Sequence, residues 1–315
     1  VAERLVKALG RPYEINGHQI IVSASIGIAV CPDDGGDVDE IMIAADLALY
    51  AAKAAGKNGH CFFQREMTDE VKSLRRTEGE LRSAIQNGEL LLHYQPIIDL
   101  KRNAITGLEA LVRWKHPTRG LVPPMEFIPV AEDSGLIIPL GAWALTEACR
   151  QVAQLPDAIR IAVNLSPIQF TNPNFIDTIR SALAAARLEP ARLELEITER
   201  ILMQDNDKTL ATLHAIRDLG VQISMDDFGT GYSSLSYLQS FPFSKIKVDR
   251  AFVSRLGEAD DGGAVIKAVI DIARSLGMQT TAEGVETEEQ HRRLLDLGCP
   301  RKQLFWNNLT EYAKL

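Results

Sequence analysis

The segment LELEITERILMQDNDKTLATLHAIRDLGVQISMDD, residues 193–227, indicates most clearly which fold this chain adopts. It begins with a short apolar strand, Leu193–Thr198, in which two glutamates are the only charged side chains. Apolar residues then recur at helical spacing over Lys208–Leu219, and a second apolar strand follows at Gln222–Asp226. A strand, an amphipathic helix and another strand in this order predict a βαβ unit.

The same alternation of apolar strands and amphipathic helices extends over the chain from Glu89 onward. No Gly-rich motif of the form GxGxxG or GxxxxGK[ST] follows a strand, which weighs against an open nucleotide-binding sheet. Eight strands separated by helices therefore favour a (β/α)8 TIM-like barrel over an open doubly wound sheet. The predicted strands are Leu90–Ile97, Ile105–Trp114, Ile159–Leu165, Leu193–Thr198, Gln222–Asp226, Lys245–Val248, Thr280–Ala282 and Gln303–Trp306. The predicted helices include Met125–Ser134, Ala142–Leu155, Phe175–Ala186, Lys208–Leu219, Ala264–Leu276 and Glu288–Leu297.

A smaller α+β piece precedes this region, and its roughly 60 residues are a marginal size for an independent core. Its predicted elements are the end of a helix at Val1–Leu9, strands at Tyr13–Ile15 and His18–Val30 joined by an Asn16-Gly17 turn, a helix from an Asp37 cap to about Ala55, and a strand at Cys61–Phe63.

A charged helix, about Arg65–Gln86, joins the two parts. Its apolar residues recur at steps of three and four, which predicts one apolar face. That face either docks on the following domain or pairs with a second copy in a parallel coiled coil, and Gly79 weighs against the coiled coil. We therefore divide the chain into residues 1–64, a linker helix at 65–88 and a main domain at 89–315.

The overall charge limits the class of ligand. The chain has a formal net charge of -8, so it offers no basic field for polymeric nucleic acid. A small anionic ligand remains compatible, because bound divalent cations reverse the local sign of a carboxylate-rich pocket.

The cysteines point to a reducing compartment. Cys31, Cys61, Cys149 and Cys299 lie far apart without a CxxC pair, which argues against a zinc site and a disulfide framework and suits the cytoplasm. No apolar run reaches the roughly 18 residues that a membrane span needs. The chain opens inside a predicted helix, so we expect a fragment of a longer protein, in which a membrane anchor could lie upstream.

Polar side chains gather where the predicted barrel strands end, at the edge that forms the catalytic mouth of such a barrel. Closely packed carboxylates repel one another and take up protons, and a divalent cation relieves that strain. Oxygen ligands without His or Cys predict Mg²⁺ or Mn²⁺, and carboxylates around paired cations suit in-line displacement at phosphorus. These residues are Glu109, Asn164, Glu196, Asp226, Asp227, Lys247, Glu283 and Gln303.

Two features of this set leave alternatives open. Lys247 either holds the attacking water or only neutralises Asp226 and Asp227. The Gly-rich stretch that begins at Asp227, DFGTGYSS, is either a mobile gate or a tight turn between a strand and a helix.

With these residues in view, positions from about 90 to 303 resemble the bacterial EAL domain. The motifs that carry the resemblance follow in the family's order along the chain. They are Tyr94-Gln95-Pro96, Glu109-Ala110-Leu111-Val112-Arg113-Trp114, Val163-Asn164-Leu165-Ser166, Glu196-Ile197-Thr198-Glu199, the 226–234 loop, Lys245-Ile246-Lys247-Val248-Asp249, Ala282-Glu283-Gly284-Val285-Glu286-Thr287 and Gly298-Cys299.

The resemblance implies a barrel that hydrolyses cyclic di-GMP to linear pGpG with two Mg²⁺ or Mn²⁺ ions. It implies metal-site roles for Glu109, Asn164, Glu196, Asp226, Asp227 and Glu283, with Glu109, Asp226 and Asp227 counted with Lys247 as catalytic residues. Lys247 matches the water-positioning lysine, and Glu199 matches the acid that anchors the loop after Asp227. Gln95, Arg113 and Glu286 match substrate-contacting positions. Gln303 matches a glutamine beside the active site and is counted with them as substrate-binding.

The two ends of the chain differ from a complete pair of domains. Residues 1–64 resemble the closing portion of a GGDEF domain without its signature motif, so the remaining strands should expose sheet edges. After Gln303 the chain reads Leu304-Phe305-Trp306-Asn307-Asn308, where the family has a glycine, an aromatic residue and a proline-containing turn. We expect Leu304 to crowd the last strand and the closing helix to be truncated or replaced.

Three functions follow from this pattern. The first is a cyclic di-GMP phosphodiesterase, which the complete acid set and Lys247 support. The second is a non-catalytic cyclic di-GMP receptor or scaffold, which the altered C-terminus motivates. The third is another metal-dependent phosphodiester hydrolase. The resemblance also implies a homodimer, and upstream sensory and GGDEF portions in the parent protein.

Overall fold

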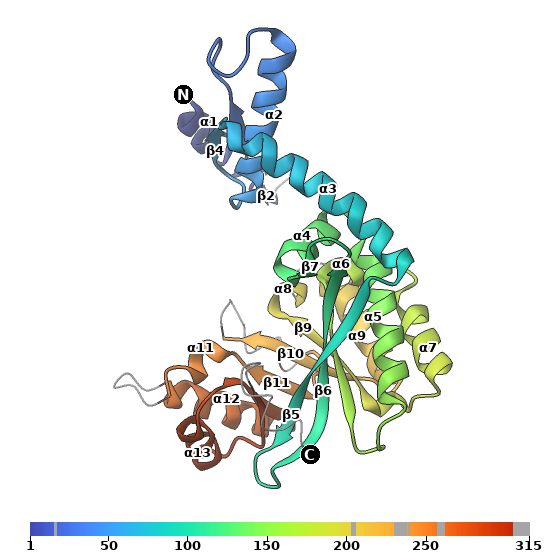
Figure 1. Cartoon of the computed structure of the whole chain (residues 1–315). Helices are drawn as coiled ribbons and strands as arrows, with labels where there is room; N and C mark the ends of the chain where they lie inside the picture. The colour runs from blue at the N-terminus through green and yellow to red at the C-terminus, as the bar shows by residue number, and fades with distance from the viewer. Residues whose placement is uncertain (16–17, 203–205, 230–237, 239, 257–261, 305–315) are drawn as a thin grey trace. The chain divides into compact units, whose positions relative to one another are not determined.

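The computed structural model describes residues 1–15, 18–202, 206–229, 238, 240–256 and 262–304 (Figure 1). Contacts within it divide the chain into two units, Val1–Glu80 and Leu81–Leu315. No helix among the described residues combines the length and the apolar character that crossing a membrane requires.

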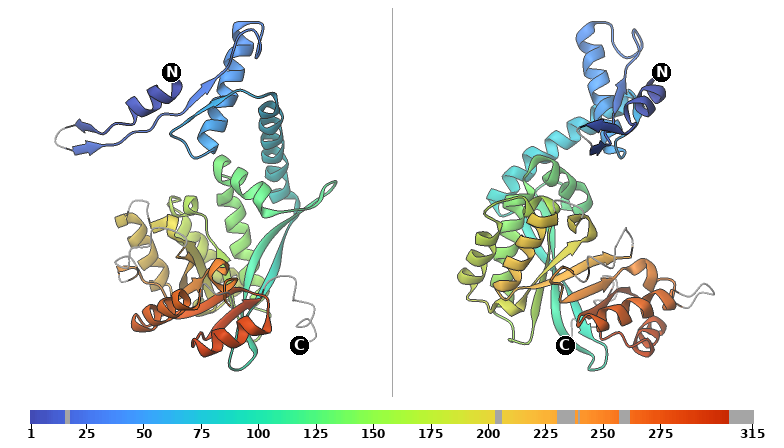
Figure 2. Two further views of the ribbon diagram at one scale, coloured as in Figure 1. Left: turned by 90° about the vertical axis from the view of Figure 1, so that its left-hand side faces the viewer. Right: turned by 180° about the vertical axis from the view of Figure 1, so that it is seen from behind.

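Eight strands of the second unit close into a ring, which confirms the predicted barrel class (Figures 1 and 2). Each predicted strand is present within a few residues, and β9 and β11 have the predicted bounds. The ring runs β5 (Leu90–Asp99), β6 (Ala104–His116), β8 (Arg160–Asn164), β9 (Leu193–Thr198), β10 (Gln222–Phe228), β11 (Lys245–Val248), β12 (Gln279–Val285) and β13 (Arg301–Leu304), which pairs back to β5.

The first strand departs from a simple alternation of parallel strands and helices. β5 is antiparallel to both of its neighbours, β6 and β13, whereas the other pairs of the ring are parallel. A short turn joins β5 to β6, because Asp99 Oδ1 accepts hydrogen bonds from the backbone N–H groups of Lys101 and Arg102 and Asn103 takes a φ of 48°. β6 continues beyond the ring and pairs there with β7 (Gly120–Val122).

Helices cover the outside of the strands (Figure 2). Pro139 and Gly141 do not stop α5, which starts before the predicted Ala142, because a proline in the first turn removes no helical hydrogen bond. The longer helices are α4 (Pro124–Ser134), α5 (Ile137–Val152), α7 (Phe175–Ala186), α9 (Asn206–Asp218), α12 (Gly263–Ser275) and α13 (Glu288–Asp296). The shorter ones are α6 (Pro167–Phe170), η1 (Pro190–Arg192), α8 (Glu199–Leu202) and α11 (Arg250–Val253).

The hydrophobic core lies between the barrel and these helices, and the barrel interior is polar. Leu193, Leu195 and Ile197 of β9 belong to the main hydrophobic cluster, as do Ile246 and Val248 of β11. Because side chains alternate across a strand, the residues between them face the inside of the ring. Those inward positions carry glutamates on β9 and lysines on β11, all of them buried.

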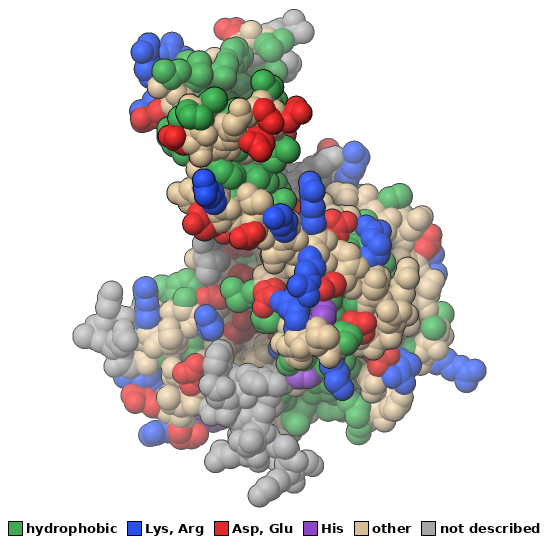
Figure 3. Space-filling view, turned by 45° about the horizontal axis from the view of Figure 1, so that its top comes forward, with side chains coloured by type: hydrophobic (Ala, Val, Ile, Leu, Met, Phe, Trp, Pro, Cys, Tyr) green, Lys and Arg blue, Asp and Glu red, His purple; other side chains and the backbone are tan. Residues whose placement is uncertain are grey.

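In its described residues, the first unit contains α1 (Ala2–Leu9), α2 (Val38–Ala54) and the short strands β1 (Tyr13–Ile15), β2 (His18–Ile20), β3 (Ile26–Ile28) and β4 (His60–Phe62). The expected cap on α2 is present, since Asp37 Oδ1 accepts from the N–H of Glu40 at 2.9 Å. Among the described residues each sheet of this unit has two strands, so strand edges are left unpaired as expected. Exposed hydrophobic side chains gather on this unit, among them Val38, Met42 and Ile43 (Figure 3).

The prediction of one long strand at His18–Val30 is wrong. β2 pairs with β1, and β3 pairs with β4 in a separate sheet. Gly27 of β3 lies so close to α2 that a Cβ atom there would stand 2.0 Å from the carbonyl oxygen of Ala45. β3 therefore packs closely on α2, and residues 21–25 between β2 and β3 form no strand.

The linker helix α3 (Arg65–Asn87) contributes its last turns to the second unit. Leu81 and Ala84 are fully buried there in a cluster with Leu90, Trp114 and Phe127. At the other end of the unit, Leu304 is the last residue of β13. The expected crowding by its side chain and the expected change to the closing helix, in residues 305–315, lie outside the described part of the chain.

Candidate active site in the barrel interior

A buried lysine occupies the centre of the barrel interior. Lys247 lies on β11, and 2% of its side chain is exposed. Its Nζ is 2.7 Å from Glu196 Oε2 and 3.1 Å from Asp226 Oδ1. The same atom is 2.5 Å from Glu283 Oε1 and 3.5 Å from Glu109 Oε2. Four strands, β6, β9, β10 and β12, thus each direct one carboxylate at a single ammonium group.

Glu109 is held by two side-chain amides. Asn164 Nδ2 at the end of β8 donates to Glu109 Oε1 at 2.5 Å, and Gln303 Nε2 of β13 donates to Glu109 Oε2. Glu109 lies in the middle of β6 rather than at its end, because β6 continues past the ring to pair with β7.

Local breaks in the strands aim three acids at one spot. The pairing of β10 with β11 shifts between Met225 and Phe228, and Asp227 has a left-handed φ of 53°, which is uncommon outside glycine. The pairing of β12 with β13 shifts in the same way between Ala282 and Val285, and Glu283 lies between these two residues. As a result, one oxygen each of Asp226, Asp227 and Glu283 lies within 4.8 Å of the others.

Burial and repulsion between neighbouring acids raise the pKa values of three carboxyl groups of the cluster. Burial, together with repulsion from Asp226, raises the pKa of Asp227 to about 6. Burial also raises the pKa of Glu283 to about 8, although the nearby Lys247 opposes this shift. The pKa of Glu196 is raised by burial and by repulsion from Glu109. Burial acts to lower the pKa of Lys247, but the surrounding carboxylates outweigh it and raise that pKa, so the ammonium stays charged.

The donor set fits divalent cations. One ammonium faces four carboxylates, which leaves uncompensated negative charge in a buried place. In the described structure, the buried atoms Glu196 Oε1 and Gln303 Oε1 have no hydrogen-bond partner. Carboxylate and amide oxygens are the ligands that Mg²⁺ and Mn²⁺ prefer. Glu109, Asn164, Glu196, Asp226, Asp227 and Glu283 are the residues that could hold such ions.

The other predicted site residues stand around this cluster. Gln95 on β5 is the cross-strand partner of Glu109. Arg113 lies four residues further along β6, where burial lowers the pKa of its guanidinium, and Glu286 follows the end of β12. Glu199 Oε1 accepts from the N–H of Gly229 at 3.1 Å, at the start of the Gly-rich loop whose residues 230–234 lie outside the described structure.

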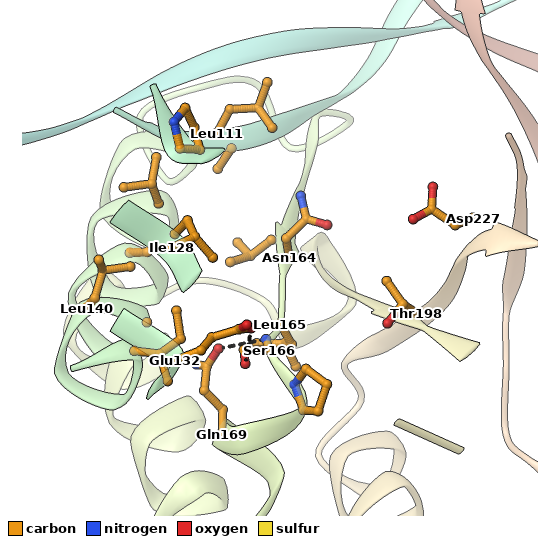
Figure 4. Close-up of a pocket in the computed structure, with 18 of the residues that line it drawn as sticks. Leu111, Ile128, Glu132, Leu140, Asn164, Leu165, Ser166, Gln169, Thr198 and Asp227 are labelled. Carbon is orange, nitrogen blue, oxygen red and sulfur yellow. Dashed lines mark hydrogen bonds between the residues drawn. The ribbon is translucent and has the colours of Figure 1, made fainter. Parts of the chain in front are cut away.

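A pocket of about 770 Å³ opens beside the acids (Figure 4). Figure 4 shows Leu111, Ile128 and Leu140 on one side of it, and Asp227 on the other, with Asn164 between them. This volume is within the roughly 300–1,000 Å³ of ordinary small-molecule sites.

Three polar residues of this pocket were not among the predicted site residues, although Ser166 belongs to one of the quoted motifs. Glu132 of α4 accepts a hydrogen bond from Ser166 Oγ at 2.6 Å, and Gln169 closes a capping box with Ser166 at the start of α6 (Figure 4). The spacing of Ser166 and Gln169 could have predicted the cap. No sequence pattern near Glu132 predicts that α4 places this residue beside Ser166.

The sequence matches two family profiles. The EAL domain profile covers residues 78–303, and the profile described as "Diguanylate cyclase, GGDEF domain" covers residues 1–59. The larger match spans most of the chain and contains every residue of the buried cluster.

Curated relatives match almost the whole chain. The "Bifunctional diguanylate cyclase/cyclic di-GMP phosphodiesterase MucR" of Pseudomonas aeruginosa is 45% identical over 309 residues, which are 97% of this chain and 45% of the relative. The "Cyclic di-GMP phosphodiesterase PdeR" of Escherichia coli is 37% identical over 308 residues, 97% of this chain and 46% of the relative. The chain therefore spans less than half the length of either protein.

Solved structures have the same fold. One described as "PaMucR Phosphodiesterase, c-di-GMP complex" is 43% identical, with a TM-score of 0.70 over 74% of this chain and 96% of that one. The EAL enzyme Bd1971, in a form with cAMP and cyclic di-GMP bound, is 34% identical, with a TM-score of 0.72 over 78% of this chain and 69% of that one.

Proposed function

The chain belongs to the EAL domain family, and we propose that its barrel hydrolyses cyclic di-GMP to linear pGpG with the help of two divalent cations, Mg²⁺ or Mn²⁺. The observation that carries this proposal is the buried cluster in which Lys247 meets four carboxylates from four strands. A folding requirement alone would not favour so much like charge inside a barrel, because burying unpaired charge is costly. Relatives named as cyclic di-GMP phosphodiesterases give the substrate class.

Bound cations would polarise the scissile phosphate and lower the pKa of the attacking water. We propose that Lys247 holds that water by donating a hydrogen bond to its oxygen. Its raised pKa keeps the ammonium charged, so it would stabilise negative charge on the attacking oxygen. Glu196, 2.7 Å away, fixes the direction of the ammonium.

The residues around the cluster would hold the rest of the substrate. We propose that Gln95, Arg113 and Glu286 contact the dinucleotide. Arg113 lines the pocket and Gln95 pairs with Glu109, whereas Glu286 is assigned from its match to the family motif. A guanidinium on the pocket wall suits a phosphate oxygen. The apolar side of the pocket suits the flat face of a base.

The test is hydrolysis of cyclic di-GMP by the purified chain with Mg²⁺, with Mn²⁺ or with EDTA, with products separated by chromatography. We expect pGpG only with a divalent cation. If the folded chain binds the dinucleotide but releases no product, this proposal is wrong and the chain is a cyclic di-GMP receptor or scaffold. If the chain hydrolyses other phosphodiesters and not cyclic di-GMP, it is a different metal-dependent phosphodiester hydrolase.

We also propose a cytoplasmic setting and a homodimer. The described cysteines form no disulfide, which agrees with a reducing compartment. Light scattering at micromolar concentration should give twice the mass of the chain, and a monomer would refute the dimer.

A further inference from the structure

A second lysine–glutamate pair lies one layer deeper in the barrel. Lys245 Nζ is 2.6 Å from Glu194 Oε1 and 2.5 Å from Glu194 Oε2. Their side chains are 5% and 3% exposed. Lys245 and Glu194 precede Lys247 and Glu196 by two residues on the same two strands, β11 and β9. The period of two along each strand therefore stacks one pair below the other.

The surroundings of the deeper pair are polar as well. Ser224 of β10 and Thr281 of β12 are fully buried, and in the described structure their hydroxyl oxygens have no hydrogen-bond partner. β10 runs between β9 and β11, so the pair reaches across it. Arg160 and Arg301 line the small cavity at this level together with Lys245 and Glu194.

Stability does not explain this pair. The inner layers of (β/α)8 barrels are usually filled by branched apolar side chains. Replacing a buried ion pair by apolar residues of similar volume is often neutral or stabilising. The pair instead links β9 directly to β11, because Lys245 Nζ donates to both carboxylate oxygens of Glu194.

We propose that Glu194 and Lys245 are positioning residues for the reaction at Lys247, an inference that rests on the proposed function. By tying β9 to β11 across β10, the deeper pair sets the distance from Lys247 to Glu196, and with it the contacts of Lys247 with Asp226 and Glu283. Neither residue would touch substrate or cation.

The test replaces both members at once by Glu194→Leu with Lys245→Met, so that no unpaired charge is buried and folding is maintained. The matched control is Lys267→Met with Asp271→Leu. This double change removes a partly exposed ion pair on α12, in which Lys267 Nζ is 2.8 Å from Asp271 Oδ1. For the variant of the deeper pair we expect cooperative melting and weaker Mn²⁺ binding. We also expect kcat to fall about 10²-fold at unchanged KM, which is the effect of a small misplacement of a catalytic group. The control should match the wild type.

A crystal structure of the Glu194→Leu, Lys245→Met variant decides the positioning role independently of activity. We expect the 3.1 Å contact of Lys247 with Asp226 to be lost. A variant that keeps the contacts of Lys247 and the kcat of the wild type would overturn the inference. If the wild type itself does not hydrolyse cyclic di-GMP, the proposed function fails, and the crystal structure still accepts or rejects the positioning role.

Discussion

At the scale of single residues, the site departs from what folding alone would select. Glu109, Glu196, Asp226 and Glu283 surround one lysine. Burial raises the pKa values of Glu196 and Glu283 there. Proteins tolerate such conflicts mainly at functional sites. The strand-end acids and Lys247 could be found from the sequence, because each interrupts an apolar strand. Their shared contacts could not, because they join residues up to 194 positions apart.

Removing the ammonium should affect rate more than affinity. We expect Lys247→Met to bind cyclic di-GMP as tightly as the wild type, while kcat falls by roughly 10²-fold or more, the scale of a group that positions or activates water. Equilibrium binding and steady-state kinetics check this. Loss of binding would mean that Lys247 mainly holds the carboxylates together.

Removing one charge from Glu109 should weaken cation binding. Glu109→Gln keeps the volume of the side chain but loses a ligand oxygen, so we expect Mn²⁺ affinity to fall by at least about 10-fold and turnover to be abolished. Calorimetric titration measures the affinity. Glu126→Gln, on the outer helix α4, is the control, and wild-type behaviour of Glu109→Gln would refute the assigned role.

The raised acid pKa values predict how stability depends on pH when EDTA has removed divalent cations. Glu283, with a pKa of about 8, and Asp227, with a pKa of about 6, bind more protons in the folded chain than in the unfolded chain. The free energy of unfolding should therefore fall as pH rises from about 4.5 to about 8. Thermal melts should show a larger stabilisation by Mg²⁺ at about pH 8.5 than at about pH 5.5. An equal stabilisation at both pH values would contradict the cation site.

At the scale of elements, the sequence predicted most strands and helices because their periods of two and 3.6 are regular. It did not predict that β5 runs antiparallel, since the Asp99 turn fixes the direction and the apolar pattern does not. It did not predict the break between β2 and β3, because the apolar pattern does not show that the two strands pair with different partners. It also passed over Glu194 and Lys245, although their spacing of two from Glu196 and Lys247 indicates the same inner face.

The bulge in β12 should be sensitive to a single methyl group. Gly284 has a φ of 66°, and a Cβ atom there would stand 2.5 Å from Arg250 Cβ. Gly284→Ala should displace Glu283 and lower Mn²⁺ affinity, with a loss of stability of about 1–3 kcal/mol from overpacking and strain. Gly277→Ala is the control, because Gly277 also has a positive φ but open space around it. Equal effects of the two changes would exclude the steric explanation.

At the scale of the whole molecule, the end of α3 belongs to the barrel unit. Leu81 and Ala84 are buried in its second hydrophobic cluster. A chain of residues 65–315 should therefore fold and retain cyclic di-GMP turnover, whereas residues 89–315 should melt at a lower temperature. Within the full chain, Leu81→Ala should cost about 2–5 kcal/mol of unfolding free energy. Equal melting temperatures of the two shortened chains would contradict this role for α3.

We propose that water, held beside Lys247 in a carboxylate-lined barrel, opens the phosphodiester ring of cyclic di-GMP. The most direct measurement is to incubate the purified chain with cyclic di-GMP and Mn²⁺ in ¹⁸O-labelled water and to analyse the products by mass spectrometry. We predict pGpG with one labelled oxygen in its terminal phosphate, and no product when EDTA is present. A folded chain that binds cyclic di-GMP with Mn²⁺ and leaves it intact would contradict the claim.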